Sequence, residues 1–144
     1  MKRKFTFSLF LLYCAIMLWM LFDRTRTDPT QTYWAQLSHH LNLVPFRTNW
    51  EYIRILTTSH SAAQLRHAVI CLFGNVLTFI PFGFFLPRLW NTSLRKTLTV
   101  GLLCVICIEL IQLFTLTGSC DIDDLLLNLP GIAIGWWLHS LRKK

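Results

Sequence analysis

The sequence predicts an all-α integral membrane protein of one domain, with four transmembrane helices at residues 5–22, 67–87, 97–117 and 124–141. Of its 144 residues, 53% are hydrophobic and 15% are charged, whereas a soluble domain has about 25% charged residues. The apolar residues gather in long runs rather than at the spacing of a soluble core. Nine of the 14 lysines and arginines stand in three short patches beside these runs, a distribution typical of a membrane protein.

The first apolar run, residues 5–22, follows Lys2-Arg3-Lys4 and so begins like a secretory signal. However, the run is long enough to cross a bilayer. The residues after it are Asp23-Arg24-Thr25-Arg26, which contain no small-x-small cleavage site. We therefore expect an uncleaved first span.

Residues 23–66 form a polar loop of 44 residues, a length that normally includes some structure. Within it, Trp50, Ile53 and Leu56 share one helical face and Glu51 lies on another. The spacing predicts a short amphipathic helix. Two interpretations follow: the helix lies at the membrane interface, or it covers a site as a lid.

The second span, residues 67–87, includes two polar residues, Asn75 and Thr78. Pro81 and Gly83 follow them, and a proline inside a helix removes a backbone hydrogen bond. We expect a kink there, with the freed backbone groups satisfied by neighbouring helices.

The third span, residues 97–117, is interrupted by Glu109 and Gln112, which lie one turn apart on the same face. A carboxyl group in the hydrocarbon layer is costly unless it is neutral or paired. We therefore expect it either to be protonated or to pair with a cation from the outer loop. The candidate partners are Arg47, Arg54 and Arg66.

The fourth span, residues 124–141, opens on three carboxylates and carries a stripe of polar and small residues at intervals of 3, 4, 3 and 4. The stripe consists of Asp121, Asp124, Asn128, Gly131 and Gly135. The two glycines form a G-x-x-x-G pattern, which lets another helix approach closely. Asp121 and Asp124 have the spacing of N-cap and N3 residues, so helix capping is an alternative role for them.

Four spans place both termini on one side of the membrane. All three basic patches fall on that side: Lys2-Arg3-Lys4, Arg88 with Arg95-Lys96, and Arg142-Lys143-Lys144. All the carboxylates except Glu109 fall on the other side, with Asp124 at the outer end of the fourth span. The positive-inside rule therefore predicts that both termini are cytoplasmic, with the 23–66 loop and the acidic loop outside.

These positions converge on a polar pocket in the outer half of the membrane. At 1.5 Å per residue, Glu109 lies roughly 12 Å below the outer surface, and Asn75 lies at a similar depth. The candidate ligand-binding residues are Asn75, Glu109, Gln112, Asp121, Asp124 and Asn128. The amide side chains among them have an alternative role as hydrogen-bonding links between helices.

Several site classes are not expected. The basic residues form no stripe interleaved with aromatics, so we expect no nucleic-acid partner. Three successive acids at one helix start point in different directions, so we expect no metal and no cofactor. Cys104 and Cys107 form a C-x-x-C pattern in mid-membrane, where a thiolate is disfavoured, so we expect no redox site.

Four segments in this order resemble a known family. They are Asn42-Leu43-Val44-Pro45-Phe46, then Asn75-Val76-Leu77-Thr78-Phe79-Ile80-Pro81-Phe82-Gly83-Phe84-Phe85-Leu86-Pro87, then Glu109-Leu110-Ile111-Gln112, then Asp121-Ile122-Asp123-Asp124-Leu125-Leu126-Leu127-Asn128 with Gly131 and Gly135. Together, over about residues 42–137, they resemble the VanZ-like family of bacterial membrane proteins, named for a protein linked to teicoplanin resistance. The chain departs from it at Gly118-Ser119-Cys120, where many relatives carry an arginine, and at Pro130, where relatives often have leucine.

The resemblance implies a multi-pass protein of the bacterial inner membrane, sometimes associated with tolerance of glycopeptides, but it supplies no reaction. We expect a factor that acts at the cell envelope among membrane lipids. It would bind a polar ligand, such as a lipid-linked cell-wall component or a glycopeptide. One alternative is an intramembrane enzyme with Glu109 as general acid or base and Asp124 as its partner. Another is a subunit that docks other proteins through Gly131 and Gly135.

Overall fold

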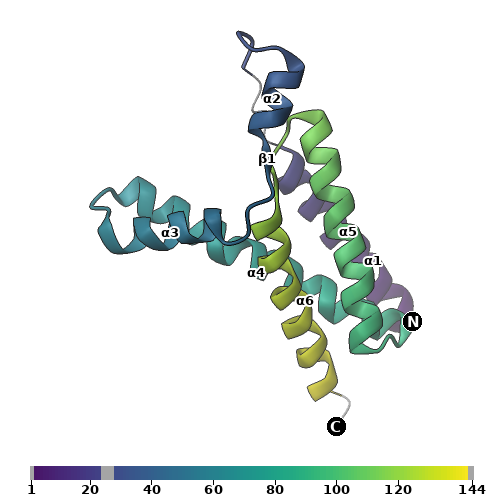
Figure 1. Cartoon of the computed structure of the whole chain (residues 1–144). Helices are drawn as coiled ribbons and strands as arrows, with labels where there is room; N and C mark the ends of the chain where they lie inside the picture. The colour runs from purple at the N-terminus through teal and green to yellow at the C-terminus, as the bar shows by residue number, and fades with distance from the viewer. Residues whose placement is uncertain (1, 24–27, 143–144) are drawn as a thin grey trace.

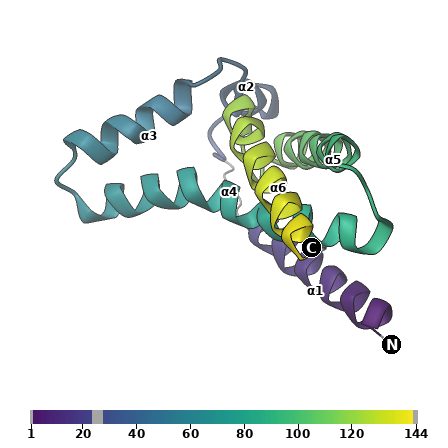
Figure 2. The ribbon, with the colours of Figure 1, turned by 90° about the horizontal axis from the view of Figure 1, so that it is seen from below.

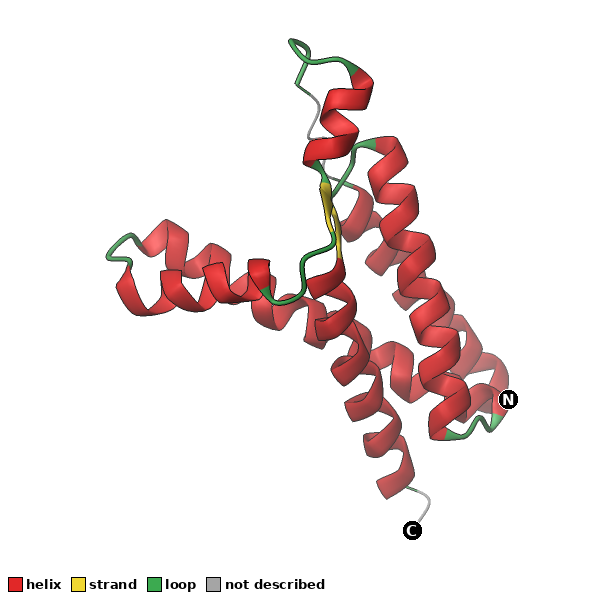
Figure 3. Cartoon of the chain, in the orientation of Figure 1, coloured by secondary structure: helices red, strands yellow, loops and turns green. Residues whose placement is uncertain are grey.

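The computed structural model describes residues 2–23 and 28–142, and this part of the chain is almost entirely helical (Figure 3). Six helices and two very short strands follow one another along it. They are α1 (Lys2–Phe22), α2 (Tyr33–His39), β1 (Leu41–Asn42), α3 (Arg47–Thr58), α4 (Ala62–Trp90), α5 (Leu94–Thr115), β2 (Cys120–Asp121) and α6 (Ile122–Leu141).

Three of the helices are long and apolar enough to cross a membrane: Arg3–Phe22 in α1, Ala62–Trp90 in α4 and Leu94–Thr115 in α5. Large apolar side chains on them face outward, such as Phe5 at 67% exposure and Leu103 at 57%. This surface suits lipid rather than water, so the prediction of a multi-pass membrane protein holds. The predicted fourth span forms as helix α6, which contains two acids, an asparagine and a proline and is not one of these three helices.

The loop between the first two spans contains the predicted amphipathic helix. α3 covers the expected residues and leaves Trp50 and Ile53 exposed on one side. α2 and β1, also in this loop, were not predicted. α3 and the first half of α4 form a hairpin that projects away from α1, α5 and α6 (Figures 1 and 2).

Helix α4 runs for 29 residues and stays helical through Pro81 and Pro87. At 1.5 Å per residue it is about 43 Å long, which exceeds the hydrocarbon thickness of about 30 Å. A helix of this length must tilt or extend beyond the hydrocarbon layer.

Helices α4 and α6 cross in close contact because glycines lie at the crossing. A Cβ atom on any of three glycines would overlap backbone atoms of the other helix. The overlaps are Gly131 with the Val76 carbonyl oxygen, Gly135 with the Ile80 carbonyl oxygen, and Gly83 with the Ile132 carbonyl oxygen. The predicted close approach therefore takes place within this chain, between α6 and α4.

The core lies where α1, α4, α5 and α6 meet. It is built from buried apolar side chains of all four helices, chiefly Phe10, Phe79, Phe82, Val105, Ile108 and Ile132. The helices that carry the polar side chains near the start of α6 are therefore held together by this packed core.

The two short strands tie the outer loop to the start of α6. β1 pairs with β2 in parallel, with Leu41 opposite Cys120 and Asn42 opposite Asp121. The backbone N–H of Cys120 also donates to the carbonyl oxygen of His40 at 2.8 Å. This pairing sets the acidic segment beside the turn that leads into α3.

Candidate functional site

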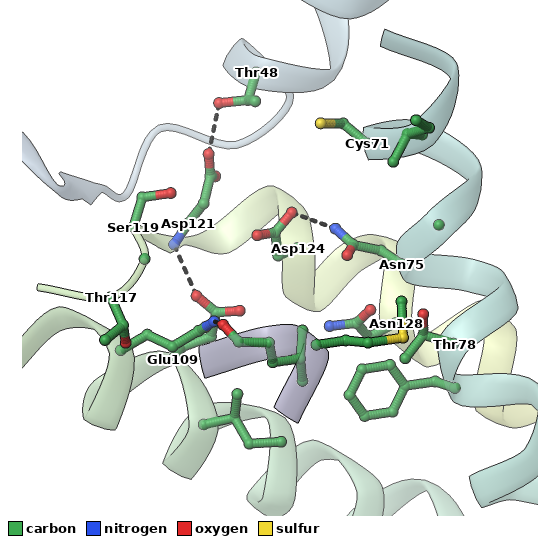
Figure 4. Close-up of a pocket in the computed structure, with 18 of the residues that line it drawn as sticks. Thr48, Cys71, Asn75, Thr78, Glu109, Thr117, Ser119, Asp121, Asp124 and Asn128 are labelled. Atoms are coloured by element: carbon green, nitrogen blue, oxygen red, sulfur yellow. Dashed lines mark hydrogen bonds between the residues drawn. The ribbon is translucent and has the colours of Figure 1, made fainter. Parts of the chain in front are cut away.

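A cavity of about 170 Å³ lies between α1, α3, α4, α5 and α6 (Figure 4). All six of the predicted ligand-binding residues line it: Asn75, Glu109, Gln112, Asp121, Asp124 and Asn128. α3 adds Thr48 and Tyr52 to the wall, which sequence reasoning did not single out. One face of α3 therefore covers the cavity, while Trp50 and Ile53 face outward.

Asp121 is the N-cap of α6, as its spacing predicts. Its Oδ1 accepts the backbone N–H of Asp123 at 2.9 Å. Its Oδ2 accepts the Thr48 hydroxyl at 2.6 Å and the Asn42 side-chain amide at 3.1 Å. These bonds occupy both oxygens, so Asp121 joins α6, α3 and the β1 turn and has a structural role at the cavity wall.

Asp123 is fully buried and caps a helix other than its own. Its carboxylate accepts the backbone N–H groups of Phe46 and Asn49, the latter at 2.9 Å. α3 begins at this point, and Phe46, its N-cap, has no side chain that accepts a hydrogen bond. The positive end of the α3 dipole thus meets a carboxylate from α6.

Sequence reasoning gave Asp123 no role. One feature of the sequence could have indicated this role. The N-cap of α3 is Phe46, whose side chain cannot accept a hydrogen bond, so the first N–H groups of α3 need an acceptor from another part of the chain. Phe46 also has a positive φ of 64°, an uncommon conformation for a bulky residue. The bond from its N–H to Asp123 helps to hold that conformation.

Glu109 and Asp124 reach the cavity from different helices. Glu109 of α5 is only 4% exposed, and its Oε2 accepts the backbone N–H of Asp121 at 3.3 Å. Asp124 of α6 accepts a hydrogen bond from the Asn75 side-chain amide of α4. Figure 4 shows these side chains around one space, so three helices contribute polar groups to it.

The predicted ion pair at Glu109 is wrong for all three of its candidate partners. Arg47 pairs instead with Glu51, at 4.0 Å on the surface of α3, and neither Arg54 nor Arg66 forms an ion pair with Glu109. The hydrogen-bond partner of Glu109 is local instead: it is the backbone N–H of Asp121, which follows α5 in the chain. None of the described residues that line the cavity is lysine, arginine or histidine.

The amide residues differ in how they are satisfied. Gln112 donates to the carbonyl oxygen of Leu21 at 2.8 Å and so links α5 to α1, which matches the alternative of an interhelical link. Asn128 is 3% exposed, and within the described part of the chain its buried Oδ1 has no hydrogen-bond partner. An unsatisfied buried acceptor is costly, and this one belongs to a residue of the cavity wall.

Gly131 and Gly135 lie on the same helix but not in the cavity wall. Both are buried against α4. The face predicted as a docking surface is therefore covered by the chain itself.

The model of the VanZ/LLP1 family matches residues 10–143, which is nearly the whole chain. The chain belongs to the VanZ/LLP1 family. It has no significant match among curated proteins or among solved structures.

In this VanZ/LLP1 chain, the segments that carry the resemblance meet in space although they lie far apart in the sequence. The 42–46 turn bonds to Asp121 and Asp123, and Asn75 bonds to Asp124. Gly118 and Ser119, in the segment where the sequence departs from the resemblance, also line the cavity.

Proposed function

We propose that this VanZ/LLP1 protein is a four-span protein of the bacterial inner membrane that binds a polar ligand in its intramembrane cavity and acts at the cell envelope. The observation that carries the proposal is the unsatisfied Oδ1 of Asn128, buried in the wall of a cavity that also holds Glu109 and Asp124. A buried acceptor left without a partner, beside other polar side chains around one space, is expected of a binding site. Groups that only linked helices would be satisfied by one another.

The proposed fourth span is α6. Its 20 residues extend about 30 Å, which matches the hydrocarbon thickness. Its polar residues are turned toward the protein: Asp123 is 0% and Asn128 is 3% exposed. A span can carry such residues when they face the bundle interior. The polar residues of α6 are therefore compatible with its crossing the membrane.

The proposed orientation places both termini in the cytoplasm. The ends of the described chain lie at the same end of the molecule (Figure 1). At that end, Arg88 and Arg142 both lie over the ring of Phe84. Asp121 and Asp123 lie at the opposite end of α6, next to the outer loop. This separation of charge supports cytoplasmic termini and an outward-facing cavity.

In this proposal the ligand comes from the envelope, as a lipid-linked cell-wall component or a glycopeptide, and its capture raises tolerance of teicoplanin. Susceptibility tests this directly. Wild type, Asn128→Leu and Glu109→Gln are expressed at matched membrane levels in a glycopeptide-sensitive bacterium that lacks relatives. Glu51→Gln is the control, because it removes a carboxylate that is exposed on α3 and lies outside the cavity.

We expect wild type and Glu51→Gln to raise the teicoplanin concentration needed to stop growth. We expect Asn128→Leu and Glu109→Gln to lose most of this protection. Equal protection by all four proteins would overturn the role of the cavity. No protection by wild type would overturn the link to glycopeptides.

A further inference from the structure

A second pocket lies at the opposite end of the molecule from the start of α6, where the first turns of α1 meet the last turn of α4. This α1–α4 groove has a volume of about 570 Å³, within the range of about 300–1,000 Å³ that holds small-molecule ligands. It is lined by Arg3, Lys4, Phe7, Ser8, Leu89 and Trp90. It shares no lining residue with the cavity that contains Glu109, so it is a separate site.

The two helices that form the groove are fastened to each other. The guanidinium of Arg3 donates a hydrogen bond from Nη2 to the carbonyl oxygen of Leu89 at 3.2 Å. The ring of Trp90 packs edge-on against Phe7 and Phe10, with centroid distances of 6.4 Å and 5.8 Å. Leu89 is itself a member of the buried core. The groove therefore has a packed floor, and its walls are held in place by contacts between α1 and α4.

The groove is positively charged. Arg3 and Lys4 both line it, and neither α1 nor α4 contains an aspartate or a glutamate. Among the described residues, neither of these two cations forms an ion pair. A guanidinium has five N–H donors and an ammonium has three, and the bond to Leu89 uses one of them. The two side chains can therefore donate to an anion that comes from outside the chain.

The groove also has an apolar side, which an inorganic anion would leave unused. Phe7 and Trp90 line it and are 43% and 49% exposed. Arg3 and Lys4 directly precede the apolar run 5–22, so they lie at the level where head groups meet the hydrocarbon layer. A ligand with a negative head and an apolar tail would contact both parts of the wall.

We propose that the α1–α4 groove binds an anionic phospholipid, with Arg3 and Lys4 on its phosphate and its acyl chains along Phe7 and Trp90. Basic side chains beside a membrane span attract such lipids, and arginine is well suited to phosphate oxygens because its N–H groups can donate in parallel. The bound lipid links α1 to α4 and so stabilises the fold. It belongs to the leaflet at the termini, which is the cytoplasmic leaflet in the orientation proposed above.

The test titrates three compounds into the purified full chain in a nonionic detergent and follows the unfolding temperature. They are dioctanoyl phosphatidylglycerol, dioctanoyl phosphatidylcholine and inorganic phosphate. The double variant Arg3→Gln/Lys4→Gln removes both cations of the groove. The control Arg95→Gln/Lys96→Gln removes two exposed cations from the first turn of α5, at the same end of the molecule and outside the groove (Figure 1).

Two further variants keep the test decisive. Ser8→Phe places a ring in the groove and keeps both charges, so it separates a defined site from general attraction between charges. If Arg3→Gln/Lys4→Gln does not fold, Lys4→Gln is compared with Lys96→Gln, because Lys4→Gln keeps the bond between Arg3 and Leu89.

We expect phosphatidylglycerol to give a saturable rise in unfolding temperature for wild type and for the α5 control. The apparent Kd should be about thirtyfold weaker in Arg3→Gln/Lys4→Gln, the effect expected of two cations at an anionic lipid surface. Ser8→Phe should also weaken it. Phosphatidylcholine and inorganic phosphate should bind wild type more weakly than phosphatidylglycerol does.

Equal losses of affinity in the two double variants would overturn the groove as a site, since the net charge of this end would then decide binding. Equal affinity for phosphatidylcholine would overturn the selection for an anionic lipid, and equal affinity for inorganic phosphate would overturn the lipid as the ligand. No saturable effect of phosphatidylglycerol on wild type would overturn the whole inference. All these proteins retain Asn128 and Glu109, so none of these outcomes decides the proposed function.

Discussion

The carboxylate of Asp123 on α6 accepts the backbone N–H of Asn49 on α3 at 2.9 Å, across 74 residues of sequence. A second N–H, that of Phe46, donates to the same carboxylate. One buried side chain thus sets the position of α3, and α3 in turn supplies Thr48 and Tyr52 to the cavity wall. The shape of the candidate site depends on this contact.

Replacing Asp123 should release α3. Asp123→Ala leaves two backbone N–H groups without an acceptor, and hydrogen bonds to a charged group contribute about 1.5–3 kcal/mol each. We expect a loss of about 3 kcal/mol in the free energy of unfolding, measured by denaturation in detergent. Hydrogen exchange should show faster exchange at Phe46 and Asn49. Glu51→Ala, on the exposed face of α3, is the control and should change little; equal effects of the two would contradict the cap.

Because α4 and α6 are in close contact, replacing two different glycines by alanine should change the stability of the protein by very different amounts. Gly131→Ala forces a methyl group into the carbonyl oxygen of Val76, so we expect a destabilisation of about 1–3 kcal/mol. Gly74→Ala is the matched control, because its Cβ would meet only Ile70 Cγ2 at 3.8 Å. That change should be neutral or stabilising, since alanine favours helix more than glycine does. Equal tolerance of both changes would show that the helices do not pack this closely.

Four spans predict where single cysteines can be labelled in intact cells. In a background without the native cysteines, His60→Cys should react with a membrane-impermeant maleimide from outside. Lys96→Cys and Arg142→Cys should react only after the cells are opened. Labelling of Arg142→Cys from outside would mean that α6 does not cross the membrane.

The thiol of Cys120 can report the charge of the cavity. Burial raises the pKa of this thiol, and the carboxyl groups nearby raise it further. Replacing one of these carboxyl groups should therefore lower that pKa and increase the thiolate fraction at any pH below it. With Cys120 as the only cysteine, Glu109→Gln should therefore speed alkylation near pH 8, and the rate-against-pH profile should move to lower pH. Glu51→Gln should leave the profile unchanged. A profile that does not move in Glu109→Gln would contradict the effect of Glu109 on the pKa of Cys120.

The sequence predicted those elements and site residues that depend on the spacing of nearby residues. The long apolar runs marked α1, α4 and α5, and the spacing of Trp50 and Ile53 marked α3. The i, i+4 relation of Asp124 and Asn128 placed both on one face of α6, and both line the cavity. Each of these depends on neighbours within a few residues, where helix periodicity is decisive.

The features that were missed depend on contacts between distant segments. The β1–β2 pairing involves two residues in each strand, too few to leave a pattern. An arginine was expected as the partner of Glu109 because a sequence shows its charged side chains. The partner is a backbone N–H, and every residue except proline has one, so no sequence pattern marks it. The trans cap by Asp123 likewise uses backbone donors that any residue possesses.

The central claim is that the cavity holds a specific ligand, and a crosslink inside the living cell tests it most directly. A photoreactive phenylalanine analogue replaces either Tyr52, which lines the cavity, or Trp50, which is 68% exposed on the other face of α3. After illumination, mass spectrometry identifies what is attached. The account predicts one discrete adduct at position 52 that is absent at position 50 and is lost with Asn128→Leu. The same mixture of bulk lipids at both positions, unchanged by Asn128→Leu, would contradict it.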